Sequence, residues 1–169
     1  MKKIITVFTL VGLLFTFNAC EDGLAFKFDA NFMVKMDIDV KDTGKSSTYP
    51  FTYTSLLNIE DDKDVADKIE QIKSLEITEV ECTITGIPSG ESVLELNIMV
   101  EDINLTVTLT NITENNTLVL PVSDELLDAL GKFLYDNHQT SITVSGASTY
   151  APMVLGVDLL FNSKIEASL

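Results

Sequence analysis

Residues 26–40 read FKFDANFMVKMDIDV, and this stretch decides the fold class. Every even position in it is apolar, and every odd position except Met33 carries a charge or an amide. Alternation with period two is typical of a β-strand that has one face in a core and the other in water. At about 3.3 Å per residue the strand is roughly 50 Å long, which predicts a bend, a bulge or a passage between two sheets.

The same alternation returns along most of the remaining chain. It predicts further strands at residues 51–59, 75–84, 93–100, 105–110, 117–122, 140–146 and 153–167. In the stretch 75–84 the apolar positions change from odd to even near Thr78 and Glu79, and one extra residue there predicts a β-bulge.

Two stretches change to the helical period. Val65, Ile69 and Ile72 recur at i, i+4 and i+7, which predicts a short helix over residues 62–72 with Asp61 or Asp62 as its cap. A second helix is expected over residues 123–137, beginning at Ser123. The chain is therefore expected to form a β-sandwich, immunoglobulin-like or related, of about eight strands with two short helices. A closed lipocalin-like β-barrel with a similar number of strands is the alternative.

The first twenty residues have the build of a secretory leader. Lys2 and Lys3 precede an apolar stretch at residues 4–17, and the small residue Ala19 stands just before Cys20. The apolar stretch is shorter than the roughly 20 residues that a membrane-spanning helix needs.

Residues 17–20, FNAC, resemble the loose lipobox of Bacteroidota-type outer-membrane lipoproteins. The resemblance implies that residues 1–19 are removed and that Cys20 receives acyl chains such as palmitate. An Asp directly after the cysteine would imply retention in the inner membrane. Glu21 stands there instead, which implies an outer-membrane location. The resemblance does not say which face of the outer membrane the protein occupies. Residues 20–25 would be the lipidated tether, and residues 26–169 a single β-rich domain.

Charge excludes one class of partner. The chain carries 26 acidic residues and 11 lysines, with no arginine, for a net charge of −15. Without residues 1–19, nine lysines remain and the net charge is −17. Nucleic-acid binding is not expected of such a chain, because phosphate recognition needs a basic face.

Catalytic chemistry has few residues to use. Cys82 lies in the apolar row Val80, Cys82, Ile84, where a buried small hydrophobe is expected, and His138 is the only histidine. Asp37, Asp39 and Asp42 suggest a calcium loop, but the spacing of an EF-hand is not kept. No motif of a nucleophile, metal centre or phosphate loop occurs. We expect no enzymatic activity, no metal and no cofactor.

Three residues are candidates to face a ligand. Asp158 stands in a strand whose apolar Val154 and Leu160 predict cover on both faces, while Tyr53 and Tyr150 lie in or beside turns. Two functions fit the sequence. The first is a non-catalytic binding or accessory module, anchored to the membrane by lipid on Cys20 and contacting another envelope protein. The alternative is a carrier that holds an apolar ligand or lipid in a cavity between its sheets.

Overall fold

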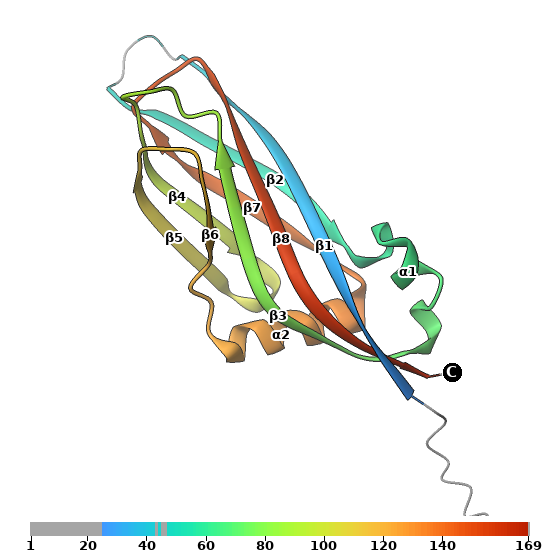
Figure 1. The fold of residues 1–169 in the computed structure, drawn as a ribbon. Helices are drawn as coiled ribbons and strands as arrows, with labels where there is room; N and C mark the ends of the chain where they lie inside the picture. Colours follow the sequence, from blue (N-terminus) through green and yellow to red (C-terminus); the bar gives the residue numbers. More distant parts are fainter. Residues whose placement is uncertain (1–24, 43, 45–46, 169) are drawn as a thin grey trace, which may run out of the picture.

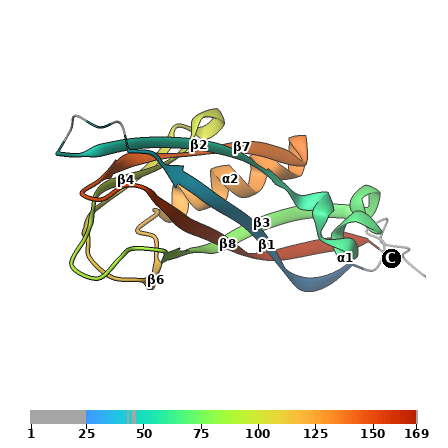
Figure 2. The ribbon, with the colours of Figure 1, turned by 90° about the horizontal axis from the view of Figure 1, so that it is seen from above.

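The alternating stretch forms one uninterrupted strand, β1 (Ala25–Val40), in a computed structural model that describes residues 25–42, 44 and 47–168. Its even positions from Ala30 to Val40 are buried and its odd positions are exposed, as the alternation predicts. No bulge interrupts its pairing with the last strand. The strand instead curves along its length (Figure 2).

Seven more strands and two α-helices follow in the described residues (Figure 1). The strands are β2 (Tyr49–Asn58), β3 (Ile72–Thr85), β4 (Val93–Val100), β5 (Leu105–Ile112), β6 (Asn116–Val119), β7 (Gln139–Ser148) and β8 (Met153–Ser168). The helices are α1 (Lys63–Ala66) and α2 (Asp124–Asn137), with 3-10 turns η1 (Ile59–Asp61), η2 (Ile69–Gln71) and η3 (Glu101–Ile103).

The strands form two four-stranded sheets that stack face to face. The first sheet has the order β1-β8-β3-β6 and the second the order β2-β7-β4-β5, and all the pairings are antiparallel. The strands thus pair as 1 with 8, 2 with 7, 3 with 6 and 4 with 5, which is the connectivity of a jelly roll. The predicted β-sandwich is confirmed, in this form rather than the immunoglobulin-like one. No pairing joins the two sheets within the described residues, so the lipocalin-like barrel is wrong.

The space between the sheets is filled by their inward rows. Met36 and Ile38 of β1, Leu96 of β4, Ile142 of β7 and Leu155 of β8 are at most 1% exposed. Such rows bury apolar area on both inner faces, and this burial is the main stabilising contribution of a sandwich. The inward row of β8 has one polar member, Ser163, whose hydroxyl donates to the carbonyl oxygen of Ala30 at 2.7 Å.

Helix α2 packs against strand β3 beyond the end of β6. Leu127, Leu130 and Leu134 form its buried stripe. Gly131 sits so close to β3 that a Cβ on it would lie 2.6 Å from the carbonyl oxygen of Leu75. The predicted bounds of this helix are confirmed. The bulge predicted near Thr78 is also confirmed, by a register shift between residues 77 and 79 of β3.

The single helix expected over residues 62–72 is wrong. Asp62 does cap α1, since its carboxylate accepts from the backbone N–H groups of Asp64 at 2.9 Å and Val65 at 3.2 Å. The α-helix nevertheless ends at Ala66, and a 3-10 turn leads into β3. So short a helix gains little from its own hydrogen bonds, and Ile72 is already paired with Ala167 of β8.

Candidate functional site

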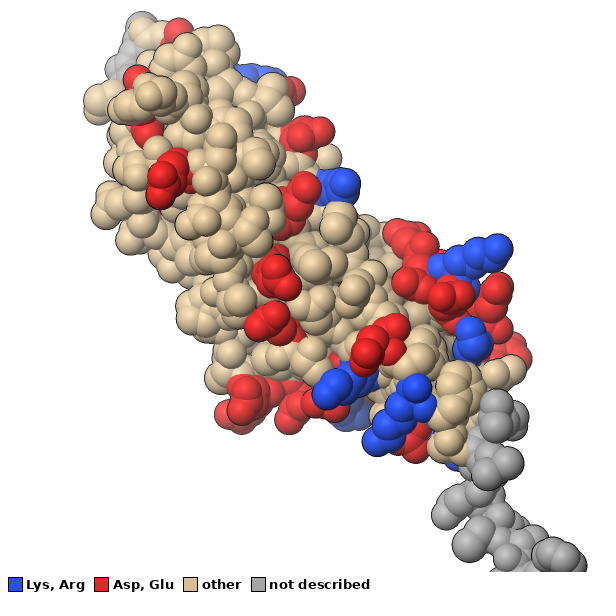
Figure 3. Space-filling model, in the orientation of Figure 1, with Lys and Arg blue, Asp and Glu red and all other residues tan. Residues whose placement is uncertain are grey.

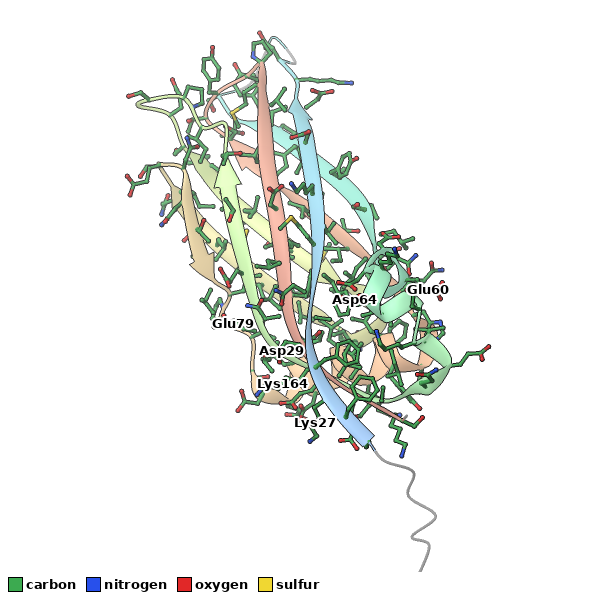
Figure 4. All side chains as sticks on the ribbon, turned by 45° about the vertical axis from the view of Figure 1, so that its right-hand side comes forward. Lys27, Asp29, Glu60, Asp64, Glu79 and Lys164 are labelled. Carbon is green, nitrogen blue, oxygen red and sulfur yellow. The ribbon has the colours of Figure 1, made fainter. Side chains whose placement is uncertain are left out.

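The outer face of the first sheet is a ladder of opposite charges. Lys27 and Glu166 form an ion pair at 3.4 Å, and Asp29 lies opposite Lys164 in the β1–β8 register. Figure 4 shows Lys27, Asp29 and Lys164 on this face. Exposed pairs of this kind add little to stability and keep a sheet face solvated. We assign no site to this face.

A polar cluster lies farther along the same face. The side-chain amide of Asn162 donates to the carboxylates of Glu79 at 3.3 Å and Glu81 at 3.0 Å. In the described residues no group of three or more acidic, histidine or cysteine side chains is placed to hold a metal ion. Asp37 and Asp39 are exposed on β1, and the carboxylate of Asp42 accepts from the N–H of Gly44 at 2.7 Å.

The three candidate ligand-facing residues do not share a site. Asp158 is partly buried on the outer face of the first sheet, opposite Lys35. Tyr150 lies in the β7–β8 connection and is 38% exposed. Tyr53 is 41% exposed on β2, an edge strand, opposite the buried Val144.

The cover predicted over both faces of β8 is wrong. Val154 is 53% exposed, and Leu160 is only partly buried. Helix α2 packs against β3. That Asp158, Tyr150 or Tyr53 faces a ligand stays a prediction.

Cys82 belongs to the core, as predicted. The residue is fully buried in β3, and burial together with the nearby charge of Asp158 raises the pKa of its thiol to about 12. A thiol that stays protonated at neutral pH and is closed to solvent is a poor nucleophile. His138, the one candidate base, instead forms a hydrogen bond to the Glu60 carboxylate at 2.9 Å.

One of several surface hollows lies beside His138 and has a volume of about 310 Å³. His138 ends α2 in a left-handed conformation, and its carbonyl accepts from the N–H of Ile59 at 3.0 Å, which ties the helix end to η1. The lining residues are Ile59, Ile69, Glu70, Ile72, Tyr135, Asp136 and His138. The polar side chains of this hollow are two carboxylates, the imidazole of His138 and the phenol of Tyr135.

Another hollow, of about 330 Å³, lies between strands β5 and β6. These strands are edges of different sheets, so the hollow is a groove along one open side of the sandwich. Its apolar members are the partly buried Leu109, Ile112 and Leu118. Sequence reasoning missed both hollows, because alternation gives the face of a strand but not its position in a sheet.

Lysines are distributed unevenly over the surface. In Figure 3, most of the visible lysines, drawn in blue, lie toward the end of the molecule at which β1 begins. Between Lys73 and Lys132 the chain has eleven Asp and Glu residues and no Lys or Arg. This segment contains most of β3, all of β4, β5 and β6, and the first half of α2. The charged residues that this segment places around the β5–β6 groove are therefore all acidic.

Comparison with known proteins adds no family. No family model matches the chain, and no curated protein matches it. Among solved structures, it is similar to the decameric BFDV capsid protein, with a TM-score of 0.48 and 7% identity over 84% of this chain and 99% of that one. It is also similar to a protein of Desmodium yellow mottle tymovirus, with a TM-score of 0.41 and 8% identity over 100% of this chain and 94% of that one. These likenesses are distant, and no functional conclusion rests on them.

Proposed function

We infer that this chain is a lipid-anchored protein of the bacterial outer membrane whose sandwich binds another envelope protein without catalysis. The observation that carries the anchoring is the leader, with its lysines, its short apolar stretch and a cysteine directly after Ala19. Acyl chains contribute about 0.8 kcal/mol per buried methylene, so several chains on Cys20 would hold the protein permanently. No helix in the described residues is long and apolar enough to cross a bilayer.

The position of β1 favours a domain close to the membrane. Strand β1 begins at Ala25, five residues after Cys20. Five extended residues reach at most about 17 Å. A domain on so short a tether meets partners that are themselves in or at the membrane.

The filled interior favours a binding module over a carrier. A carrier needs a cavity of several hundred Å³ among its inward rows. The inward rows are instead packed against one another, and the two hollows described above are lined by helix ends, strand edges and turns. Binding would then take place on an outer surface.

The anchoring is tested by expressing the full chain in a bacterium that processes lipoproteins. The mature protein should partition into detergent, and its mass should show residues 20–169 plus acyl groups on Cys20. Cys20→Ala should leave a water-soluble protein, whereas Cys82→Ala should still be acylated. A mature protein with an unmodified N-terminus would overturn the anchoring.

A further inference from the structure

Strand β5 is an open sheet edge without the usual protection. Its eight residues pair with β4 on one side and, in the described part of the chain, with no strand on the other. It has no proline and no charged residue, with the sequence LTVTLTNI. Natural sandwiches usually protect such edges with charges, prolines or very short strands, because free N–H and C=O groups pair with other chains.

The other three edges carry that protection. Edge strand β1 has Lys or Asp at most of its outward positions, β2 contains Pro50, and β6 is only four residues long. Of the four edges in the described residues, β5 alone has none of these devices, although β2 beyond Pro50 is also uncharged.

The groove beside β5 has the composition of a strand-binding site. Leu109, Ile112 and Leu118 form its apolar part, and threonines and asparagines surround them. Farther along this side of the sandwich, α2 packs against residues 75–77 of β3, so the opening is confined to the half that α2 does not cover. A volume of about 330 Å³ suits a few apolar side chains of an added strand.

The acidic residues around the groove determine which kind of added strand β5 would favour. The segment from residue 74 to 131 has only acidic charges, and Glu114 lines the groove itself. Glu95 of β4 lies opposite Thr110 of β5. A segment with lysines or arginines between its apolar residues is attracted to this side, and an acidic segment is repelled.

We propose that β5 receives an extended, net-basic segment of a second envelope protein as an additional strand, with its apolar side chains against Leu109, Ile112 and Leu118. Main-chain hydrogen bonds to β5 supply affinity, and the groove and the acidic surroundings supply specificity. The location of the partner rests on the proposed function, but the strand-binding property does not.

A second copy of the chain is a worse occupant. Two β5 strands related by a two-fold axis pair antiparallel, which places the two β1 starts at opposite ends of the dimer, since the strands run along the long axis (Figure 1). Both copies then cannot stand on short tethers in one membrane. Two acidic sides would also repel each other.

The test uses residues 21–169, which contain every described element and the whole buried core. The probe is a labelled peptide of about ten residues that alternates valine and lysine. Its controls are the valine–glutamate counterpart and a valine–lysine peptide interrupted by proline. Fluorescence anisotropy gives the affinity, and hydrogen exchange shows which strand becomes protected.

The lysine peptide should bind and protect residues 105–112, and both control peptides should bind at least about tenfold more weakly. Thr110→Lys should weaken binding about tenfold, whereas Thr52→Lys, also an exposed strand threonine of the second sheet, should change it less than about twofold. No binding at about 1 mM, equal binding of the glutamate peptide, protection outside β5, or self-association through β5 would each overturn the proposal. Because this domain lacks Cys20, the result is independent of whether the anchoring holds.

Discussion

Gly131→Ala is expected to destabilise the fold although alanine is the better helix former. The glycine lies in the middle of α2, where the change should favour the helix by about 1 kcal/mol. The new Cβ, however, would lie 2.6 Å from the carbonyl oxygen of Leu75, 3.1 Å from the nitrogen of Ile77 and 3.3 Å from the Cα of Glu76. All three are backbone atoms of β3, which pairs with β8 on its other side and therefore cannot move aside.

The helix must then move outward and loosen the contacts of Leu130 and Leu134. Overpacking costs roughly 1–3 kcal/mol, and a contact of 2.6 Å with backbone that cannot yield puts the cost here at about 2–3 kcal/mol, which exceeds the propensity gain. We expect a net loss of about 1–2 kcal/mol in the free energy of unfolding, measured by urea denaturation of residues 21–169. At about 2–4 °C per kcal/mol for a domain of this size, the melting temperature should fall by several degrees.

Lys132→Ala is the matched control, because its side chain is 78% exposed on the same helix and pairs with the exposed Asp136. It should change the stability by less than about 0.5 kcal/mol. A Gly131→Ala protein as stable as the parent, or more stable, would refute the close packing of α2 on β3.

Three further predictions concern single contacts. Asp62→Ala should cost about 1 kcal/mol of unfolding free energy through loss of the α1 cap, with Asp61→Ala near neutral in the same urea assay; equal losses would contradict the capping role. Ser163→Ala should cost roughly 1 kcal/mol, since the buried carbonyl of Ala30 loses its hydroxyl donor, and an unchanged denaturation midpoint would argue against that bond. The pKa of Cys82 is about 12 in the fold against 9.0 for a free thiol, so the unfolded chain loses this proton first as pH rises. Its contribution to stability is therefore complete below pH 9 and is lost between about pH 9 and 12, and a Cys82→Ala protein should lose less stability over that range than the parent does.

The sequence predicted the strands and helix α2 because the hydrophobic period that produces them lies within each segment. The period-two row of residues 26–40 reappears as the buried face of β1, and the shift near Thr78 reappears as a bulge in β3. Ser123 marks the start of α2 correctly, although its side chain makes no capping hydrogen bond. The backbone carbonyl of Ser123 instead accepts hydrogen bonds from the N–H groups of Leu126 and Leu127.

Strand partners were not predictable, because alternation specifies which face is buried and not which strand lies alongside. The pairing of β1 with β8 joins the two ends of the domain, and a single sequence has no local signal for it. The candidate site was the least predictable part, because it depends on which strands lie alongside one another. Tyr53 lies on the edge strand β2, Tyr150 in the β7–β8 connection and Asp158 on the outer face of the first sheet, whereas the β5–β6 groove exists only once two edges meet. The absence of lysine between Lys73 and Lys132 was visible in the sequence and indicates the same side of the molecule.

A native mass spectrum of residues 21–169, purified from a bacterial host under gentle conditions, tests the central claim most directly. That claim is a filled sandwich that binds a protein on its outer surface, and it predicts a bare monomer with the mass of the polypeptide alone. Additional mass that disappears on denaturation would contradict it, since a captured small molecule would mean that the domain is a carrier.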